Sequence, residues 1–312
     1  RVYRVAEAIG QRFAARLVSL GEALMQVHFP VSQDRLKAAR ERLGFDEIFY
    51  LQMGVLRQKR DWKSVEGRRF PVSDEWLDAR LTNLPYTLTS AQQKSLEEIR
   101  ADLDSGKPMN RLVQGDVGSG KTVVAALGAS MVIENGAQAA IMAPTSILAE
   151  QHYRNFVSLL AGDGGFLQQS EIRLLVGDTP EAEKEAIRQG LADGSIRMII
   201  GTHAVIEGPV IFKDLQFVVI DEQHRFGVDQ RAELRSKGTN PHLLVMTATP
   251  IPRTLQMAMS GLRELSTIQT PPVDRLAVRT YVMEWDDMVM REALLREHHR
   301  GGQSFIVVPR IA

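Results

Sequence analysis

The sequence contains no cysteine among its 312 residues. This absence excludes a disulfide-bonded scaffold, a zinc site with cysteine ligands and a thiol nucleophile. The sequence also lacks an apolar run of about 18 residues, the length that a membrane-spanning helix needs, so no interaction with a membrane is predicted. An excess of one charge is missing too, because 38 basic residues balance 38 acidic ones. A chain that grips nucleic acid through its bulk charge is therefore not predicted.

What is present favours folded domains. Hydrophobic residues make up 44% of the chain, which is enough for packed cores and excludes disorder as the main state. A length of 312 residues fits two ordinary domains, or one large domain with a smaller attached segment. The chain begins with Arg1 rather than Met and finishes in Phe305–Arg310, which has the pattern of a strand that has just begun. We expect it to be a fragment.

The first 80 residues have a helical pattern. Apolar residues recur at helical spacing from Val5 to Leu20 and again from Leu36 to Phe45. The segment His28–Ser32 interrupts this pattern, and Ser32 or Asp34 is a candidate cap for the second helix.

Charge is unevenly distributed between this helical segment and the rest. Residues 1–80 carry 15 basic and 11 acidic side chains, a net +4, so the remaining 23 basic and 27 acidic residues give −4. A basic cluster with one tryptophan could follow phosphates, but a solvated helix end and loop is the favoured interpretation. The cluster consists of Arg57, Lys59, Arg60, Lys63, Arg68 and Arg69, with Trp62 among them.

From about residue 84 the pattern becomes that of an α/β domain. Short apolar runs alternate with helical stretches, which predicts a parallel sheet covered on both faces. We divide the chain into a helical lead-in (1–80), an α/β domain (81–270) and a C-terminal part (271–312) with an extended piece at Leu276–Val282, a helix at Asp286–His299 and the terminal strand. The predicted strands are Arg111–Gln114, Ala139–Ala143, Ile172–Val176, Met198–Ile200, Phe217–Ile220 and Leu243–Met246.

A phosphate-binding loop follows the first of these strands. Gly115–Thr122 matches the pattern G-x-x-x-x-G-K-[ST] between a predicted strand and a predicted helix. Backbone N–H groups of such a loop face the phosphates, Lys121 would contact the β- and γ-phosphates, and Thr122 would ligate Mg²⁺. A chance match is expected in about one chain of this length in a hundred. The predicted nucleotide-binding residues are Gly115, Gly118, Ser119, Gly120, Lys121 and Thr122.

Two carboxylates follow the strand Phe217–Ile220, in a Walker B arrangement. Asp221 would hold Mg²⁺, and Glu222 would position or deprotonate an attacking water. The alternative is a strand that ends in solvated acids. His224 by itself would be an ordinary histidine, but beside this pair a role in relaying the state of the nucleotide is favoured.

Three segments resemble motifs of superfamily-two helicases. Asp221–His224 resembles motif II, Thr247–Pro250 resembles motif III, and Leu88–Gln92 resembles the Q motif. The resemblance implies that Gln92 reads adenine, and that Thr247, Thr249 and Arg253 couple hydrolysis to nucleic acid. Alternatively, Gln92 is a polar residue at a helix N-terminus. Each motif is weak alone, but their order and spacing are strong together.

Two further segments resemble motifs Ia and Ib. Ala143–Thr145 and Gly201–His203 each follow an apolar strand, so they should lie at the carboxyl edge of the sheet. There, hydroxyls, backbone amides and helix N-termini can hold a phosphate backbone without reading bases. Helix capping by Thr145 and Thr202 is the structural alternative, and both roles can coexist. The candidate DNA-binding residues are Pro144, Thr145, Gln151, Gly201, Thr202 and His203.

The longer stretches around these motifs resemble the RecG family of bacterial branched-DNA helicases. Met109–Thr122, Asp221–Val228 and Met246–Thr254 carry the resemblance, which covers about residues 20–254. After Thr254, segments such as Arg291–Glu297 look like Mfd, the transcription-repair coupling translocase, and both a natural intermediate and a chimera remain open. The resemblance implies a RecA-like lobe, ATP, Mg²⁺, double-stranded or branched DNA, a monomer and the bacterial cytoplasm. The Mfd-like stretch would add RNA polymerase as a partner.

These motors enclose ATP between two RecA-like lobes, and the second lobe supplies arginine fingers worth about 10³–10⁵ in rate. We therefore expect this 312-residue piece to bind ATP but to hydrolyse it slowly. A nucleotide-dependent binding module without translocation is the alternative from another class. An RNA helicase is the runner-up among motors, but Asp221–His224 reads Asp-Glu-Gln-His instead of Asp-Glu-Ala-Asp.

Overall fold

A computed structural model divides the chain into two compact units, residues 1–272 and 273–312. None of the described helices is both long and apolar enough to span a membrane. The helix predicted from Val5 onwards lies largely outside the described residues. The structure describes residues 17–63, 65–162, 165–206, 208–222, 237–248, 264–269 and 280–307.

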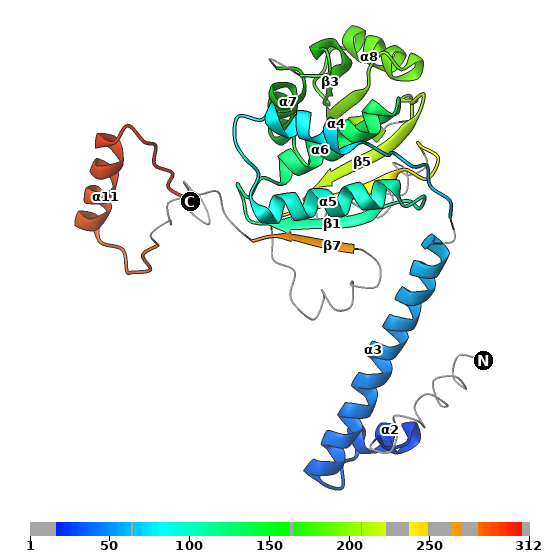
Figure 1. Ribbon diagram of the computed structural model, residues 1–312. Helices are drawn as coiled ribbons and strands as arrows, with labels where there is room; N and C mark the ends of the chain where they lie inside the picture. The colour runs from blue at the N-terminus through cyan, green and yellow to red at the C-terminus, as the bar shows by residue number, and fades with distance from the viewer. Residues whose placement is uncertain are drawn as a thin grey trace. The chain divides into compact units, whose positions relative to one another are not determined.

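A seven-stranded parallel sheet forms the centre of the first unit (Figure 1). The strand order is β3-β4-β2-β5-β6-β1-β7. All six predicted strands are present, which confirms the α/β fold class. The strands are β1 (Asn110–Gly115), β2 (Gln138–Met142), β3 (Ile172–Leu175), β4 (Met198–Gly201), β5 (Leu215–Asp221), β6 (His242–Thr247) and β7 (Glu264–Ile268).

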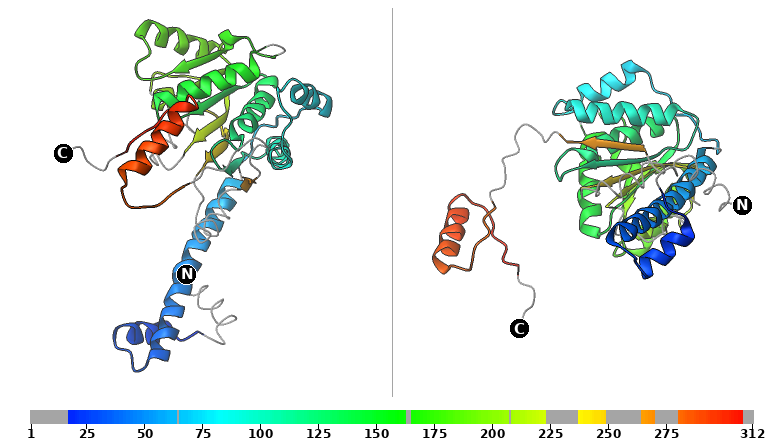
Figure 2. Two further views of the ribbon diagram at one scale, coloured as in Figure 1. Left: turned by 90° about the vertical axis from the view of Figure 1, so that its left-hand side faces the viewer. Right: turned by 90° about the horizontal axis from the view of Figure 1, so that it is seen from below.

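Helices lie on both faces of this sheet (Figures 1 and 2). Because side chains alternate along a strand, Phe217 and Val219 of β5 enter one core, and Val218 and Ile220 enter the other. Both faces of the central strands are therefore buried, as their continuous apolar runs predict. The first core is covered by α4 (Asp74–Thr82), α5 (Ser90–Asp104), α6 (Lys121–Glu134) and α7 (Ser146–Leu160), and the second by α8 (Glu181–Asp193) and the 3₁₀ turn η2 (His203–Ile206).

The predicted interruption of the N-terminal helices is confirmed. Helix α2 (Leu20–His28) ends before Pro30, and α3 (Gln33–Lys63) begins after Ser32. The Ser32 hydroxyl accepts a hydrogen bond from the Arg35 amide at 3.3 Å, so Ser32 rather than Asp34 caps α3. An ion pair of 2.5 Å between Arg35 and Glu22 joins the two helices.

The basic cluster lies at the end of α3 and in the loop after it, which agrees with the favoured interpretation. Within that loop, Arg68 is held by the protein itself. Its guanidinium donates to the Asp214 carboxylate at 2.5 Å and to the Asn135 carbonyl at 2.8 Å, and it lies 5.1 Å from the ring centre of Phe70. Arg68 therefore connects the loop to the α/β domain.

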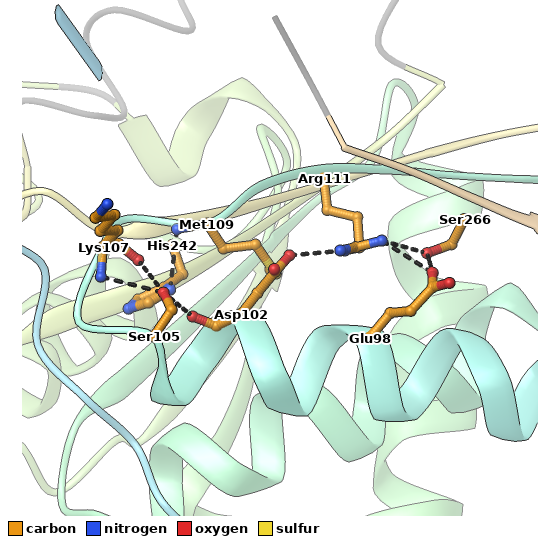
Figure 3. Close-up of polar contacts among 8 residues, drawn as sticks. All are labelled: Glu98, Asp102, Ser105, Lys107, Met109, Arg111, His242 and Ser266. Atoms are coloured by element: carbon orange, nitrogen blue, oxygen red, sulfur yellow. Dashed lines mark hydrogen bonds and ion pairs between the residues drawn. The ribbon is translucent and has the colours of Figure 1, made fainter. Parts of the chain in front are cut away.

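Strand β7 was not predicted from the sequence. It pairs in parallel with β1 at the end of the sheet, and α5 lies over both strands (Figure 1). A buried polar network holds these three elements together (Figure 3). Arg111 of β1 donates to Asp102 at 2.7 Å and Glu98 at 2.9 Å, both on α5, and to the Ser266 hydroxyl of β7 at 2.8 Å. Because only Ser266 and Ile268 of β7 are buried, its sequence lacks the apolar run of a central strand.

The second unit contains helix α11 (Asp287–His299), which confirms the helix predicted there. Its N-cap is Asp286, whose side chain accepts from the amides of Met288 and Val289. The predicted terminal strand, Phe305–Arg310, is not formed in the part of it that the structure describes. Residues 302–307 form neither helix nor strand, and Phe305 is 86% exposed.

Candidate nucleotide and DNA site

The strand register brings the predicted site segments to one edge of the sheet. At the carboxyl ends, Gln114 of β1 pairs with Thr247 of β6, and Met246 pairs with Asp221 of β5. On the other side of β5, Ile220 pairs with Met142, which pairs in turn with Gly201. The segments that resemble motifs Ia, Ib, II and III and the phosphate loop therefore follow neighbouring strands.

The phosphate loop, residues 115–120, connects β1 to α6. Gly118 and Gly120 have φ angles of +77° and +85°, a conformation that disfavours any side chain. A Cβ on Gly115 would lie 2.5 Å from the Ser119 hydroxyl and 2.9 Å from the Ile268 carbonyl oxygen. Helix α6 has no side-chain cap at Gly120, so its N-terminal amides are available to an anion.

Lys121 is half-buried at the start of α6. Its Nζ donates to the carbonyl oxygens of Gly115 at 2.7 Å and Asp116 at 3.0 Å. Burial lowers the pKa of Lys121, and the negative charges of Asp221, Glu222 and Asp116 oppose that shift. The ammonium group is thus close to both carboxylates of the predicted Walker B segment, as contact with a metal-bound triphosphate requires.

Gln92 connects α5 to the phosphate loop. Its side-chain oxygen accepts from the Thr89 amide at 2.8 Å in a capping box, and its nitrogen donates to the Ser119 carbonyl at 2.8 Å. Gln92 is 4% exposed, and a Cβ on Gly120 would lie 2.1 Å from its nitrogen. The structural alternative for Gln92 is therefore present, and adenine recognition by this residue stays a prediction.

Asp221 has a partner that the sequence analysis missed. Its Oδ2 atom lies 2.8 Å from Nε2 of His152 on α7, 69 residues away in the sequence. Both side chains are largely buried, with relative exposures of 13% for Asp221 and 9% for His152. The only signal in the sequence is the position of His152 seven residues after Thr145, which places it inside the motif Ia helix.

Glu222 has an unusual backbone conformation and contacts the motif III segment. Its φ angle is +49°, which is uncommon for a residue other than glycine and is typical of functional sites. Its amide donates to the Met246 carbonyl at 3.0 Å. Its carboxylate accepts from the Ala248 amide at 2.9 Å and from the Thr247 hydroxyl at 3.4 Å. The predicted catalytic carboxylate and the predicted coupling residue Thr247 are therefore in direct contact.

These residues fit a nucleotide with Mg²⁺. The loop around Gly115, Gly118 and Gly120 is a cradle that side chains would fill, and the Ser119 hydroxyl is buried without a partner among the described residues. No group of three or more His, Asp or Glu side chains in the described ranges could hold a metal alone. Mg²⁺ is ordinarily held by one or two carboxylates together with substrate phosphates. Thr122 and Asp221 supply suitable oxygen atoms for such a site.

The candidate DNA-binding residues lie beside each other but differ in exposure. The Ala143 amide donates to the Gly201 carbonyl at 2.9 Å, which joins the motif Ia and Ib segments. Thr145 is exposed and caps α7 by accepting from the Leu148 amide at 3.3 Å, so its capping role is confirmed. Of the others, Pro144 is half-buried and Gln151 and His203 are exposed.

The hydroxyl of Thr202 is not at the surface. Thr202 is 4% exposed, and its Oγ1 atom is buried without a partner in the described residues. The Thr202 amide donates to the Leu175 carbonyl at 3.3 Å, and its carbonyl accepts from the Val205 amide. Gly201 is also buried, and a Cβ there would lie 2.0 Å from the Leu175 oxygen. Contact of the Thr202 hydroxyl with a phosphate therefore stays a prediction that this burial does not support. His224, Thr249 and Arg253 lie outside the described residues.

Comparison with known proteins identifies the class. The family profile described as DEAD/DEAH box helicase matches residues 89–258, more than half of the chain. The chain belongs to this family, and its sheet and phosphate loop form a RecA-like lobe.

Within that family, the chain is similar to RecG. It is 45% identical over 297 residues to "ATP-dependent DNA helicase RecG" of Synechocystis sp. and 43% identical to the protein of that name in Thermotoga maritima. These matches cover 95% of this chain but only 35% and 37% of the relatives. The structure titled "Structure of RecG bound to three-way DNA junction" matches with a TM-score of 0.82 and 41% identity, over 99% of this chain and 40% of that one.

The chain therefore spans less than half the length of the relatives it matches. The RecG similarity continues along 95% of the chain, so it extends past Thr254. The Mfd-like character of the stretch after that residue stays a prediction.

Proposed function

We propose that this chain is the first motor lobe of an ATP-dependent DNA helicase or translocase that acts on branched or double-stranded DNA. One observation supports this most strongly. The Glu222 carboxylate, at the edge that carries the phosphate loop, accepts hydrogen bonds from Thr247 and Ala248 of the motif III segment. A nucleotide switch without translocation would not need this connection between hydrolysis and a nucleic-acid motif.

In this proposal each residue has a distinct task. The N-terminal amides of α6 and Lys121 bind the phosphates, and Glu222 orients the attacking water and accepts its proton. Thr122 and Asp221 would hold Mg²⁺, which neutralises phosphate charge when bound. The positive φ of Glu222 fixes the direction of its side chain against Ala248, so the base is oriented before substrate arrives.

The DNA in this proposal runs along the edge formed by the motif Ia and Ib segments. Exposed Thr145, Gln151 and His203 lie there, beside the half-buried Pro144, and would contact phosphates rather than bases. The similarity to a RecG protein bound to a three-way junction supports branched DNA as the substrate. Residues 81–270 would be the lobe, 1–80 its lead-in and 271–312 the connection to a second lobe. We further propose a monomer in the bacterial cytoplasm.

The deciding experiment measures ATP hydrolysis by the full-length protein with branched DNA, linear duplex and RNA. We expect the strongest stimulation by branched DNA, and a loss of at least about 100-fold with Lys121→Ala, because the variant lacks the phosphate-binding cation. Equal stimulation by RNA would favour an RNA helicase, and no stimulation by any nucleic acid would favour a binding module. Stimulation only in the presence of RNA polymerase would favour transcription-repair coupling. The isolated 312-residue chain should bind ATP and hydrolyse it slowly.

A further inference from the structure

The contact between His152 and Asp221 joins two parts of the candidate site that are far apart in the sequence. His152 belongs to α7, which begins at the motif Ia segment, and Asp221 ends β5. Nε2 of His152 and Oδ2 of Asp221 are 2.8 Å apart, and both groups are shielded from water. A hydrogen bond to an ionised carboxylate is strong when it is buried.

The chemistry of the two groups fixes the direction of this bond. An ionised carboxylate only accepts hydrogen bonds, so Nε2 of His152 carries the proton and donates it. Nδ1 of the same ring is buried and has no partner among the described residues. Among the described residues, the imidazole therefore forms its side-chain hydrogen bond with Asp221 only.

Helix α7 also carries the DNA-facing segment. Thr145 caps its N-terminus, and His152 lies seven residues further along, roughly 10 Å down the helix axis. The ring of Phe156, one turn later, packs edge-on against the imidazole with ring centres 6.3 Å apart. Because α7 packs as one unit on the sheet, a shift of its N-terminus moves His152 with it.

We propose that His152 is a positioning residue, which orients the Asp221 carboxylate for Mg²⁺·ATP and transmits the position of the motif Ia segment to it. This inference rests on the proposed function. Through its bond to Oδ2, His152 would fix the rotation of the carboxylate and leave the other oxygen, Oδ1, to bind Mg²⁺. DNA that binds at Thr145 would stabilise one position of α7, and so one orientation of Asp221.

The test compares three variants of the full-length protein. His152→Gln keeps an N–H donor at the position of Nε2, and His152→Leu removes it while it retains an apolar side chain. Leu160→Ala is the packing control, because Leu160 is buried in the same core two turns further along α7. Binding of a fluorescent ATP analogue is titrated with and without Mg²⁺, and kcat and KM are measured with and without branched DNA.

We expect His152→Leu to raise the Mg²⁺ concentration needed for half-maximal nucleotide binding by about 10-fold or more, since loss of a hydrogen bond to a metal-holding carboxylate typically has this effect. Nucleotide binding without Mg²⁺ should change little, and stimulation by DNA should fall. His152→Gln should restore most of both properties, and Leu160→Ala should lower thermal stability without a change in Mg²⁺ dependence.

Three results would overturn the inference. They are an unchanged Mg²⁺ dependence in His152→Leu, equal defects in the Gln and Leu variants, and an equal Mg²⁺ defect in Leu160→Ala. Each can occur while the wild-type protein hydrolyses ATP with DNA stimulation, and then only the role of His152 fails. A wild-type protein without nucleic-acid-stimulated hydrolysis would instead contradict the proposed function.

Discussion

Two regions of the sheet contain buried polar side chains, and the regions differ in whether these side chains have hydrogen-bond partners. Around Arg111, each polar group described above has a partner within the protein, and nearby His242 of β6 accepts a hydrogen bond from the Met109 amide (Figure 3). At the carboxyl edge, the Ser119 hydroxyl and Nδ1 of His152 have no partner in the described ranges, and Glu222 has a positive φ angle.

The difference shows what each region is for. A buried polar group costs free energy unless it is paired, so a fully paired network is compatible with stability alone. Backbone strain such as that at Glu222 persists only where the surrounding structure maintains it, and it clusters at functional sites. Substitutions should therefore separate the regions: changes near Arg111 should lower stability, and changes at the carboxyl edge should lower activity.

The largest expected effect is at the carboxyl edge. In the full-length protein, Glu222→Gln should reduce kcat for ATP hydrolysis by about 10²–10⁴, because an amide cannot accept the proton of water. ATP binding should persist, and the free energy of unfolding should change by less than about 0.5 kcal/mol, since the amide oxygen can still accept from Ala248. Hydrolysis assays and urea unfolding check both parts. A wild-type rate in this variant would contradict the role of Glu222.

Arg111→Met should instead lower the stability of the protein and leave ATP binding nearly unchanged. It leaves Glu98 and Asp102 without their cation, and loss of one partner from a fully buried ion pair costs about 3–5 kcal/mol. Because these two carboxylates are 31% and 25% exposed, the loss of unfolding free energy should lie near or below the lower end of that range. ATP binding at low temperature, where the variant is folded, should remain near that of the wild type.

Arg188→Met is the matched control for Arg111. Arg188 also faces two carboxylates, Glu181 and Glu185, but these lie at the surface. The substitution should therefore lower the free energy of unfolding by much less than Arg111→Met does. Equal destabilisation by the two substitutions in urea unfolding would show that burial of the Arg111 network is not the cause.

His242 should make stability depend on pH. Burial lowers its pKa, against smaller opposing effects of the Arg68 carbonyl and Asp102. Its neutral ring accepts from the Met109 amide at 3.1 Å, and its other nitrogen lies 3.0 Å from the Arg68 carbonyl. Because the unfolded chain binds this proton more readily, stability is full above the ordinary histidine pKa of about 6.5 and falls as pH decreases below it.

The slope for this one proton is at most about 1.4 kcal/mol per pH unit. Urea unfolding between pH 5 and 8 measures it, and His242→Leu, although less stable throughout, should show a shallower dependence because the other titrating groups are unchanged. Identical slopes would mean that His242 titrates equally in both states.

Ser266→Ala should have the smallest effect, about 1 kcal/mol of unfolding free energy. Arg111 and Glu98 stay paired with each other when the hydroxyl is lost, so no buried charge is left alone. Thermal unfolding measures this change. A loss as large as that of Arg111→Met would show that the serine, and not the ion pairs, holds β7.

The sequence predicted the parts of the molecule that depend on local patterns. The six central strands are continuous apolar runs, and the phosphate loop requires glycine at fixed positions because Gly118 and Gly120 have positive φ angles. Strand β7 was missed because it has one neighbour and a mixed burial pattern. The contact of His152 with Asp221 could not be predicted, because it depends on how α7 packs beside β5.

The position of Ser266 in β7 affects the register in which this strand pairs with β1 during folding. Strand β7 pairs with β1 alone among the described strands, and an edge strand with a weak apolar pattern can slip by one residue. Such a slip would put Leu265 or Thr267 where Ser266 meets Arg111, and would exchange the two faces of the strand. The Ser266 hydroxyl, between the charged side chains of Arg111 and Glu98, thus favours a single register of β7. In that register, Ile268 pairs with Gly115 at the start of the phosphate loop.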